Sequence, residues 1–450
     1  MVFKFIVENF KSFNGYTELN LISSSKIRSK IDHRVKVGTN LKVLKHAVIY
    51  GANSSGKSNL IEALSFFITT VNEGLPINSY KLYCRNKEEN KNRNSVFEIQ
   101  MELDGNYYAY GFSAILSERK ITEEWLYKLS ITGSSSCIFE RETNSKPIIG
   151  NGLIISIEEK NRFETYSSDF EDNNNSLFLS EMNRGKKLLG GLNVFENVYK
   201  AIKNNIVVIK PNSRFVNFQQ YYNTDSLTEI NEMISTFDTG VSDIRIEEID
   251  ISELERMVPQ SVLQDILENL KARKNECPYL PARFSGRTNK AFFGIELENT
   301  GDIKINTIKM RHGNSICDFG FDEESDGTRR LFDLMDILLK KSDDTVFVVD
   351  ELERSLHPKL TERFLELFIE KHKEGKAQLI FTTHEPSLMD LDLFRRDEIW
   401  FVERDNNNDS TLYPLDKFKE RYDKKLSKAY LEGRYGAIPV FKRFEFKKEK

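Results

Sequence analysis

Cysteine and long apolar runs are both scarce in this chain of 450 residues. The four cysteines are far apart and include no C-x-x-C pair, so neither a cysteine zinc site nor a disulfide framework is indicated. No apolar run approaches the roughly 18 residues of a membrane helix, and the alternating N-terminus lacks a signal-peptide layout. We therefore expect a cytoplasmic protein with reduced thiols. The cysteines are Cys84, Cys137, Cys277 and Cys317.

The chain also lacks a large excess of either charge. It has 65 Lys and Arg and 69 Asp and Glu, which gives a net charge of −4. This balance predicts no general affinity for nucleic acid or membranes. The charge is uneven, however. Residues 417–450 carry 12 basic and 5 acidic residues, a local charge of +7 that leaves −11 for the rest. Such a tail can bind nucleic acid or an acidic protein face, or form a solvated surface helix, and both interpretations stay open.

A glycine-rich segment matches the phosphate-loop pattern G-x-x-x-x-G-K-[ST] completely. The apolar run 47–50 precedes it and apolar residues at helical spacing follow it, which indicates a strand, a loop and a helix. In such a loop, backbone N–H groups surround phosphates, the lysine reaches the β- and γ-phosphates, and the hydroxyl binds Mg²⁺. The sequence therefore predicts an ATP and Mg²⁺ site. Its expected nucleotide-binding residues are Gly51, Asn53, Ser54, Ser55, Gly56, Lys57, Ser58 and Asn59, with Ser58 also on the metal.

Two acidic residues, Asp350 and Glu351, follow the apolar strand 346–349 far downstream. A carboxylate at the carboxyl end of a parallel strand lies beside the phosphate-binding crevice. Asp350 is expected to hold Mg²⁺, and Glu351 to orient and deprotonate the attacking water. Lys57 and Glu351 are therefore expected catalytic residues. An ordinary acidic strand end is the weaker interpretation after a complete phosphate loop.

Two further polar segments complete the order of motifs. His384 follows the predicted strand 378–381, where a histidine can donate to the γ-phosphate, and it is the third expected catalytic residue. Ser325-Asp326-Gly327 directly precedes an amphipathic helix. A serine hydroxyl and glycine amides at a helix start form an anion site, so these three residues are also expected to bind nucleotide.

These motifs, in this order, resemble the ABC-type ATPase heads shared by RecF, the SMC proteins and the OLD (overcoming-lysogenisation-defect) ATPases. The opening Glu8-Asn9-Phe10-Lys11-Ser12-Phe13 is similar to the N-F-[KR]-S-F start of that group. The resemblance covers residues 1–70 and 320–402. It implies that ATP is held between two heads arranged head to tail, and hence a homodimer. The implied roles are Walker A for residues 51–58, Walker B for Asp350 and Glu351, switch histidine for His384, and signature for residues 325–327.

Two features separate the chain from transporter ATPases. The signature lacks the L-S-G-G-Q form, which argues against transport. Residues 354–358 stand where the D-loop would be, without an Asp after the leucine, and their S-L-H-P form is similar to the AAA15/AAA21-like subset of OLD-like ATPases. Many members of that subset belong to bacterial defence systems. Residues 428–439 also look like its tail, whose aromatic residues could dock a partner or pack on the chain's own sheet. Gln100 stands at a plausible place for the Q-loop, which stays unassigned.

The expected fold class is α/β, an ABC-ATPase head with an inserted lobe. Its N-terminal lobe should be mostly antiparallel β, with a hairpin over 96–112 that turns at Asp104-Gly105. Alternating helix and strand patterns over 329–402 predict a parallel-sheet core. The middle lacks a sustained heptad repeat, so we expect a compact lobe there rather than a coiled coil. Its patterns up to about residue 275, such as 262–270, predict that this lobe is largely helical. The expected divisions are 1–170, the first half of the head with Walker A; 171–290, the inserted lobe; 291–415, the second half with signature, Walker B and switch histidine; and 416–450, a basic tail.

Two patterns raise the question of a built-in nuclease. Asp390-Leu391-Asp392 has the Asp-x-Asp form of Toprim nucleases, but only 58 residues follow it, too few for a Toprim domain. Arg28 and His33 have the R-x4-H spacing of HEPN-type RNases, which place it on a helix, whereas this stretch is predicted between strands. We expect a stand-alone ATPase without a nuclease of its own.

The leading hypothesis is an ATP-hydrolysing sensor or scaffold subunit of a bacterial anti-phage defence complex. It would control a separately encoded effector, expected to be a nuclease. Its other partner would be a second copy of itself, in a dimer or a higher oligomer, with nucleic acid left open and no membrane. The alternative is a RecF-like repair ATPase, whose ATP-dependent DNA binding would fall steeply with salt. The net acidity argues against this alternative, and the basic tail argues for it.

Overall fold

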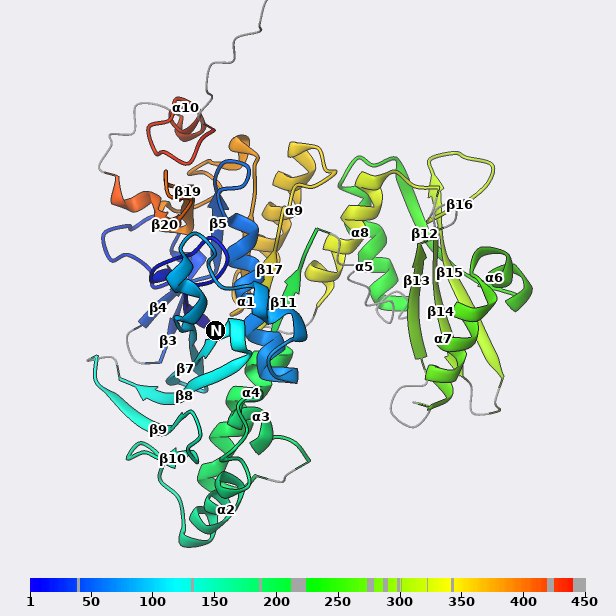
Figure 1. The fold of residues 1–450 in the computed structure, drawn as a ribbon. Coiled ribbons are helices and arrows are strands. Elements are labelled where there is room, and N and C mark those ends of the chain that lie inside the picture. The colour runs from blue at the N-terminus through cyan, green and yellow to red at the C-terminus, as the bar shows by residue number, and fades with distance from the viewer. Residues whose placement is uncertain are drawn as a thin grey trace, which may run out of the picture. The chain divides into compact units, whose positions relative to one another are not determined.

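A computed structural model describes most of the chain (Figure 1). The chain folds into two compact units. The first comprises Met1–Pro211, Ser342–Leu352 and His372–Lys450, and the second Asn212–Lys341 and Glu353–Lys371. The described residues are 1–38, 41–130, 133–185, 188–211, 224–272, 279–285, 290–297, 300, 302–321, 323–340, 344–418 and 425–439.

A seven-stranded antiparallel sheet forms the N-terminal part of the first unit, in the order β10-β9-β8-β7-β6-β1-β2. The predicted hairpin is present as β6 and β7, joined at Asp104 and Gly105, both with positive φ. Strand β6 alternates buried and more exposed side chains along most of its length, as expected for a sheet with one face on the core, whereas β7 is buried from Ala109 to Ala114. The strands are β1 Val2–Glu8, β2 Thr17–Asn20, β6 Ser95–Leu103, β7 Asn106–Ile115, β8 Lys120–Leu129, β9 Ser135–Glu142 and β10 Ile148–Ile149.

A six-stranded sheet with the order β11-β17-β18-β5-β19-β20 forms the other layer of this unit. All its pairs are parallel except β19 with β20. The strands β5, β17 and β18 are buried along their whole length, which explains their nearly continuous apolar sequences. The strands are β5 His46–Tyr50, β11 Ile206–Ile209, β17 Val346–Val349, β18 Gln378–Thr382, β19 Ile399–Arg404 and β20 Ser410–Pro414.

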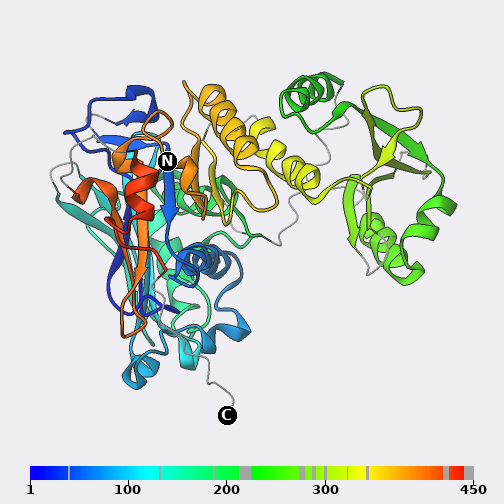
Figure 2. The same ribbon diagram turned by 90° about the horizontal axis from the view of Figure 1, so that it is seen from above.

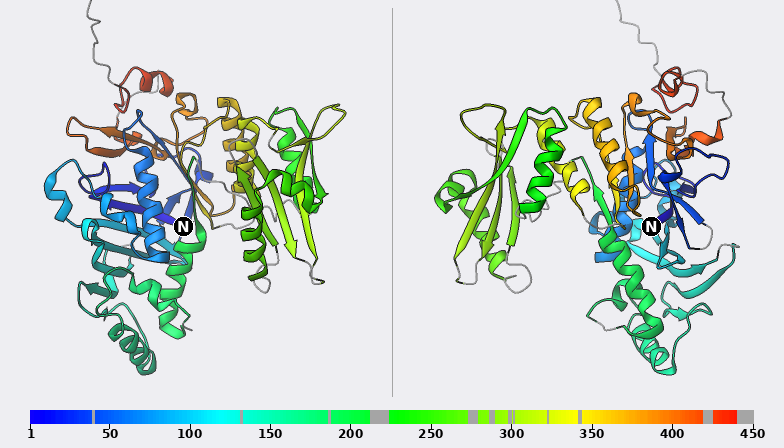
Figure 3. Two further views of the ribbon diagram at one scale, coloured as in Figure 1. Left: turned by 45° about the vertical axis from the view of Figure 1, so that its right-hand side comes forward. Right: turned by 180° about the vertical axis from the view of Figure 1, so that it is seen from behind.

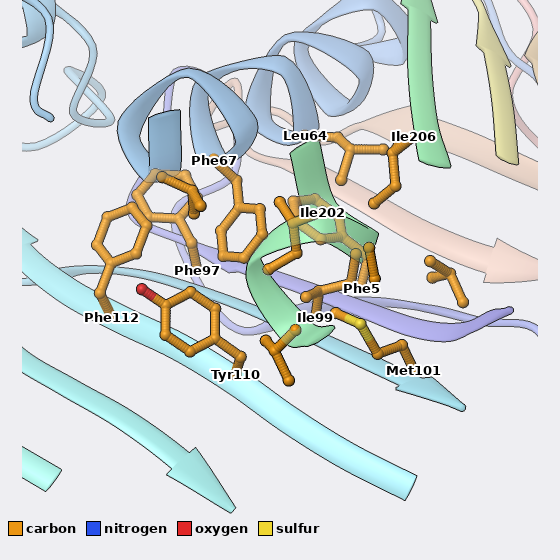
Figure 4. Packing of buried hydrophobic residues seen from close by; sticks show 14 of the residues in the cluster. Phe5, Leu64, Phe67, Phe97, Ile99, Met101, Tyr110, Phe112, Ile202 and Ile206 are labelled. Carbon is orange, nitrogen blue, oxygen red and sulfur yellow. The ribbon is translucent and has the colours of Figure 1, made fainter. Parts of the chain in front are cut away.

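Helix α1, Lys57–Glu73, shares one apolar core with both sheets (Figures 2 and 4). Phe67 of α1 lies against Phe5 of β1 and stacks on Phe112 of β7. Leu64 belongs to the same cluster as Ile206 of β11. Because this helix follows the phosphate loop directly, the core fixes the loop against the sheet.

The rest of the first unit is a small hairpin and several helices. In α4 the buried side chains recur at helical spacing, among them Phe195, Val198 and Ile202, which join the main core. Residues 171–211 thus pack in the first unit, although the inserted lobe was expected to begin at residue 171. The elements are β3 Arg34–Val37, β4 Leu41–Leu44, α2 Ile157–Ser168, α3 Phe178–Met182, α4 Asn193–Asn205 and α10 Leu426–Leu431, with short 3₁₀ helices that include η1 Ile31–His33 and η8 Arg396–Glu398.

The second unit contains a five-stranded antiparallel sheet, in the order β12-β15-β14-β13 with β16 beside β15. Helices α6 and α7 pack beside this sheet (Figure 3). Their apolar residues, such as Leu254 and Leu263, form one cluster with Phe293 of β14 and Ile305 of β15. The elements are β12 Val241–Ile249, β13 Tyr279–Ser285, β14 Lys290–Leu297, β15 Ile303–His312, β16 Phe319–Gly320, α5 Thr224–Ser235, α6 Ile251–Met257, α7 Gln260–Ala272, α8 Asp326–Leu339 and α9 Pro358–Lys371.

This mixed unit differs from the largely helical lobe expected from the sequence. Strand β12 shows why, since its buried residues Val241, Ile244 and Ile249 are three and five positions apart rather than two. A register shift between Val241 and Asp243 breaks the alternation. Helix α8, expected with the Walker B half of the head, also belongs to this unit.

The described part of the C-terminal tail packs on the chain's own sheet. Tyr430 and Tyr435 both stack on Phe401 of β19, with ring centroids 5.7 Å away, and Tyr430 also contacts Tyr50 of β5. Of the two interpretations of residues 428–439, the structure therefore shows the packing of their aromatic side chains on the chain's own sheet. The basic residues at 419–424 and 440–450, like Cys277, lie outside the described residues. Among the described residues, no helix has the length and apolar character needed to cross a membrane.

Candidate nucleotide site

Three neighbouring parallel strands of the first unit end at one edge of the sheet. Val349, the last residue of β17, pairs with Phe381 of β18, and Thr382 of β18 pairs with Ile49 of β5. The residues that follow these strands are therefore neighbours, as expected at the carboxyl ends of parallel strands. Walker A, the predicted Walker B acids and the Thr382–His384 segment meet at this edge.

The phosphate loop has the tight conformation that its small residues permit. Ser54 and Gly56 have φ values of 63° and 117°, which turn successive backbone N–H groups. A Cβ on Gly51 would lie 2.5 Å from the carbonyl oxygen of Val402, and one on Gly56 would clash with the hydroxyls of Ser12 and Ser410. The chain thus has no space for larger residues at these two positions.

Lys57 is 5% exposed, and its ammonium group is held at the loop. Its Nζ donates to the carbonyl oxygens of Gly51 at 2.8 Å and Ala52 at 3.1 Å. The same Nζ lies 3.3 Å from Nδ1 of His384, whose ring is exposed. Because an ammonium group can only donate, this contact requires Nδ1 to accept and places the proton of a neutral ring on Nε2.

The predicted magnesium ligands lie next to each other. Ser58 Oγ is 3.2 Å from Oδ1 of Asp350, whose side chain is buried. Two oxygens at this separation can both bind one Mg²⁺ at its usual distance of roughly 2.0–2.1 Å. The hard oxygen donors fit that ion, so Ser58 and Asp350 are the residues that would hold it.

Thr382 connects the two acidic residues, a role the sequence analysis missed. Its hydroxyl donates to Oδ1 of Asp350 at 2.6 Å and accepts the backbone N–H of Glu351 at 2.8 Å. Glu351 has a φ of 51°, which is uncommon for a residue with a side chain and costs on the order of 1 kcal/mol or more. Such strain persists at functional sites when the surroundings hold it, and Thr382 supplies one of those contacts.

Two serines outside the motif support the phosphate loop. Ser410 of β20 donates its hydroxyl to the carbonyl oxygen of Ser55 at 2.5 Å and its N–H to the carbonyl oxygen of Ser12 at 2.7 Å. The side-chain amide of Asn59, a residue predicted to bind nucleotide, donates to Ser12 Oγ at 2.7 Å. Ser12 belongs to the N-F-[KR]-S-F opening, which could have pointed to it, whereas no sequence signal marks Ser410. Asn53 and Ser54 are exposed at the outer part of the loop.

The predicted signature belongs to the second unit, at the start of α8. Ser325 is the N-cap of this helix, and its Oγ accepts the N–H of Thr328 at 3.0 Å. Asp326 pairs with Arg329 one turn later at 2.7 Å. A Cβ on Gly327 would lie 2.8 Å from the carbonyl oxygen of Ser355, so the signature packs closely against residues 354–358. The S-L-H-P segment and the signature therefore form one surface feature of this unit.

The patterns weighed for a nuclease have local structural explanations. Asp390 and Asp392 are exposed in a loop, where Asp390 Oδ1 accepts the N–H of Asp392 at 2.8 Å. His33 ends a single 3₁₀ turn and is buried against Glu398. Gln100, which was considered for the Q-loop rather than for a nuclease, lies within β6 and donates to Glu98.

A family model described as "AAA domain, putative AbiEii toxin, Type IV TA system" matches residues 47–390. The chain belongs to this family. The matched region begins in β5 and ends after His384, so it includes all four motifs. The predicted membership of the AAA21-like subset is thereby confirmed.

Solved structures similar to this family member include SMC heads. One is the SMC head domain from Thermotoga maritima, with 16% identity, a TM-score of 0.33, and coverage of 92% of this chain and 98% of that chain. Another is an Smc head domain with an extended coiled coil bound to the C-terminal domain of ScpA, derived from Pyrococcus furiosus, with 13% identity, a TM-score of 0.40, and coverage of 96% and 98%. A comparison with curated proteins finds no match.

Proposed function

We propose that the chain hydrolyses ATP with Mg²⁺ at the edge formed by β5, β17 and β18. This proposal rests on one observation, that the predicted site residues meet at this edge. Lys57 contacts His384, and the hydroxyl of Thr382 connects Asp350 with Glu351. Ser58 and Asp350 would hold Mg²⁺, which would supply positive charge next to the phosphates. Lys57 would bind oxygens of the β- and γ-phosphates, and Glu351 would accept the proton of the attacking water.

His384 would act through the ring proton that its contact with Lys57 places on Nε2. That N–H can donate to an oxygen of the γ-phosphate. Loss of the phosphate removes the acceptor, so the histidine would report hydrolysis to the segment that follows β18. This role needs a neutral ring, because a charged ring could not accept from Lys57.

The site would be completed by the signature of a second copy. Ser325, Asp326 and Gly327 stand at the positive end of the 14-residue helix α8, where the backbone favours an anion. In a head-to-tail dimer this helix start would approach the γ-phosphate bound to the partner. Each of the two sites would then use Walker residues of one chain and the signature of the other.

A mixing experiment tests this arrangement sharply. Lys57→Ala should abolish nucleotide binding and hydrolysis, and Ser325→Asn keeps a good N-cap for α8 while altering the signature. Each variant alone should be inactive. A heterodimer has one site with both parts intact, so an equimolar mixture should recover roughly a quarter of wild-type activity for a two-fold dimer. No recovery in the mixture, with both variants folded and dimeric, would contradict the shared site.

The biological role we propose is control of a separately encoded toxic effector in a bacterial defence system. It is supported by the family description, which associates this family with toxins and toxin–antitoxin systems. A test is to purify tagged Glu351→Gln with Mg-ATP from the native host, with Glu370→Gln as a matched exposed control. A stoichiometric nuclease that co-purifies only with Glu351→Gln supports the proposal. Salt-sensitive DNA without a protein partner would favour a repair ATPase instead.

A further inference from the structure

Two histidines and a glutamate from three distant segments meet at the amino end of the parallel sheet. His33 ends η1, His46 begins β5, and Glu398 directly precedes β19. We call these three residues the buried triad, because they are 3%, 3% and 0% exposed. Ionisable groups this deep in a protein need partners or a bound ion, since burial of an unpaired charge is costly.

The three side chains point their donor atoms at one another. Nδ1 of His33 is 2.9 Å from Oε2 and 3.1 Å from Oε1 of Glu398, and Nδ1 of His46 is 3.1 Å from Oε1. One ligand atom from each residue fits within a span of 4.8 Å. Ligands bound to tetrahedral zinc at about 2.0–2.1 Å are roughly 3.3 Å from each other, so the histidine–glutamate distances already match, and the widest pair of ligand atoms must approach by up to roughly 1.5 Å when the ion binds.

We propose that the buried triad is a zinc-binding site. Two imidazole nitrogens and a carboxylate are a usual protein donor set for Zn²⁺, and the carboxylate can contribute its second oxygen as a further ligand. When Nδ1 of each histidine binds the metal, the ring proton resides on Nε2. The site lies at the opposite end of β5 from the phosphate loop, five residues or roughly 16 Å away. Its role would be structural, separate from ATP chemistry.

The protonation states suit metal binding. Burial lowers the pKa of His46, more than its contact with Glu398 raises it, so the ring is neutral near pH 7. Burial alone would raise the pKa of Glu398, but hydrogen bonds from His33 and His46 outweigh it and lower that pKa to about 2. A neutral imidazole and an ionised carboxylate are the forms that bind zinc.

Contacts around the buried triad fix its geometry without a metal. The backbone N–H of Arg395 donates to Oε2 of Glu398 at 2.7 Å. The Arg395 guanidinium donates to Asp397 at 2.8 and 2.9 Å and to carbonyl oxygens of the loop before His33, including Ser29. Asp397 in turn accepts the N–H of Ser24 at 2.8 Å. This second layer holds the His33 segment against the Glu398 segment, as supporting contacts do in zinc sites.

The first measurement is the zinc content of the full-length wild-type protein by mass spectrometry, after growth with added zinc and removal of loose metal with a weak chelator. We expect one zinc per chain. Replacement by Co²⁺ should give the strong visible absorption of a tetrahedral nitrogen and oxygen site. His46→Asn and Glu398→Gln should each lose the ion. His312→Asn is the matched control, because His312 also pairs with a glutamate, 2.6 Å from Glu324, outside the buried triad.

The outcomes separate the two interpretations of this cluster. Zinc in the wild type and in His312→Asn, with loss in the two triad variants, supports the site. Wild-type protein without zinc and without a cobalt spectrum overturns it and leaves a hydrogen-bonded cluster only. Zinc that persists in both triad variants places the ion elsewhere and also overturns it. The wild-type measurements decide even if a variant fails to fold.

Discussion

The two ends of the same parallel sheet differ in how far their polar side chains are exposed to solvent. At the carboxyl end, Lys57 and Asp350 are buried, but Ser58 and His384 are exposed. At the amino end, every member of the buried triad is enclosed. Strand β5 connects the two, with His46 at one end and the phosphate loop after the other.

This difference shows how one strand can serve two purposes. Ligands must enter and leave a catalytic edge, so some of its groups stay open to solvent and one residue, Glu351, keeps a strained backbone. A cluster closed to solvent has no ligand that must enter and leave in each reaction cycle, and it contributes to the stability of the fold instead. Changes at the open end should therefore alter turnover with little effect on stability, and changes at the closed end should do the reverse.

Of the changes compared below, Glu351→Gln should reduce turnover most. The amide cannot accept the proton of the attacking water, so kcat should fall on the order of 10²- to 10⁴-fold while ATP binding persists. Phosphate release and nucleotide binding measured on one preparation test this, with Glu370→Gln as the control. Wild-type turnover in Glu351→Gln would show that another residue is the general base.

Acidification should weaken the closed end more than the open one. The unfolded pKa of a glutamate is near 4.5, and in the fold that of Glu398 is about 2. This depressed carboxyl pKa stabilises the protein above pH 4.5 by an amount on the order of 3 kcal/mol, which is lost as the pH falls from about 4.5 to 2. The lowered pKa of His46 acts in the same direction, starting below about 6.5.

Denaturant unfolding of the metal-free protein between pH 7 and 2.5 measures this loss. In Glu398→Gln the component from the carboxylate should be absent, so its stability should depend less on pH than that of the wild type. Parallel curves for the two proteins would mean that Glu398 has no depressed pKa in the fold.

Thr382→Val should reduce kcat by about tenfold, because the valine keeps the shape but neither donates to Asp350 nor accepts from Glu351. The matched control is Thr383→Val at the neighbouring, equally buried position. Steady-state kinetics should show the loss for Thr382 alone. Equal rates for both variants would remove Thr382 from the site.

The smallest effect should come from Tyr430→Phe, which is near the open end but only structural in role. It removes the hydroxyl that donates to the carbonyl oxygen of Ala437 at 3.1 Å and should lower the unfolding free energy by about 1 kcal/mol. Tyr80→Phe, on an exposed side chain, is the control. A change in kcat for Tyr430→Phe would instead connect the tail with catalysis.

The parts of the molecule that are local in sequence could be predicted. The phosphate loop, the acids after β17 and the histidine after β18 all have the flanking strand or helix that their motifs require. Thr382 could not be assigned, because its bridge depends on the register that pairs Val349 with Phe381. The same limit holds for the buried triad, in which Glu398 is 352 residues from His46. The extent of the second unit was missed because its strand β12 does not alternate regularly.

The strand order of the parallel sheet has a consequence for synthesis of the protein on the ribosome. Both neighbours of β5 in its sheet, β18 and β19, begin only at residues 378 and 399. At usual elongation rates of about 5–20 residues per second, the fully buried β5 therefore waits roughly 15–65 s for its first partner. Throughout that interval the apolar strand β5 has no strand to pair with and can associate with other exposed apolar segments. We expect this protein to depend on chaperones that bind nascent chains, and to be more sensitive than a locally connected domain to conditions that slow translation.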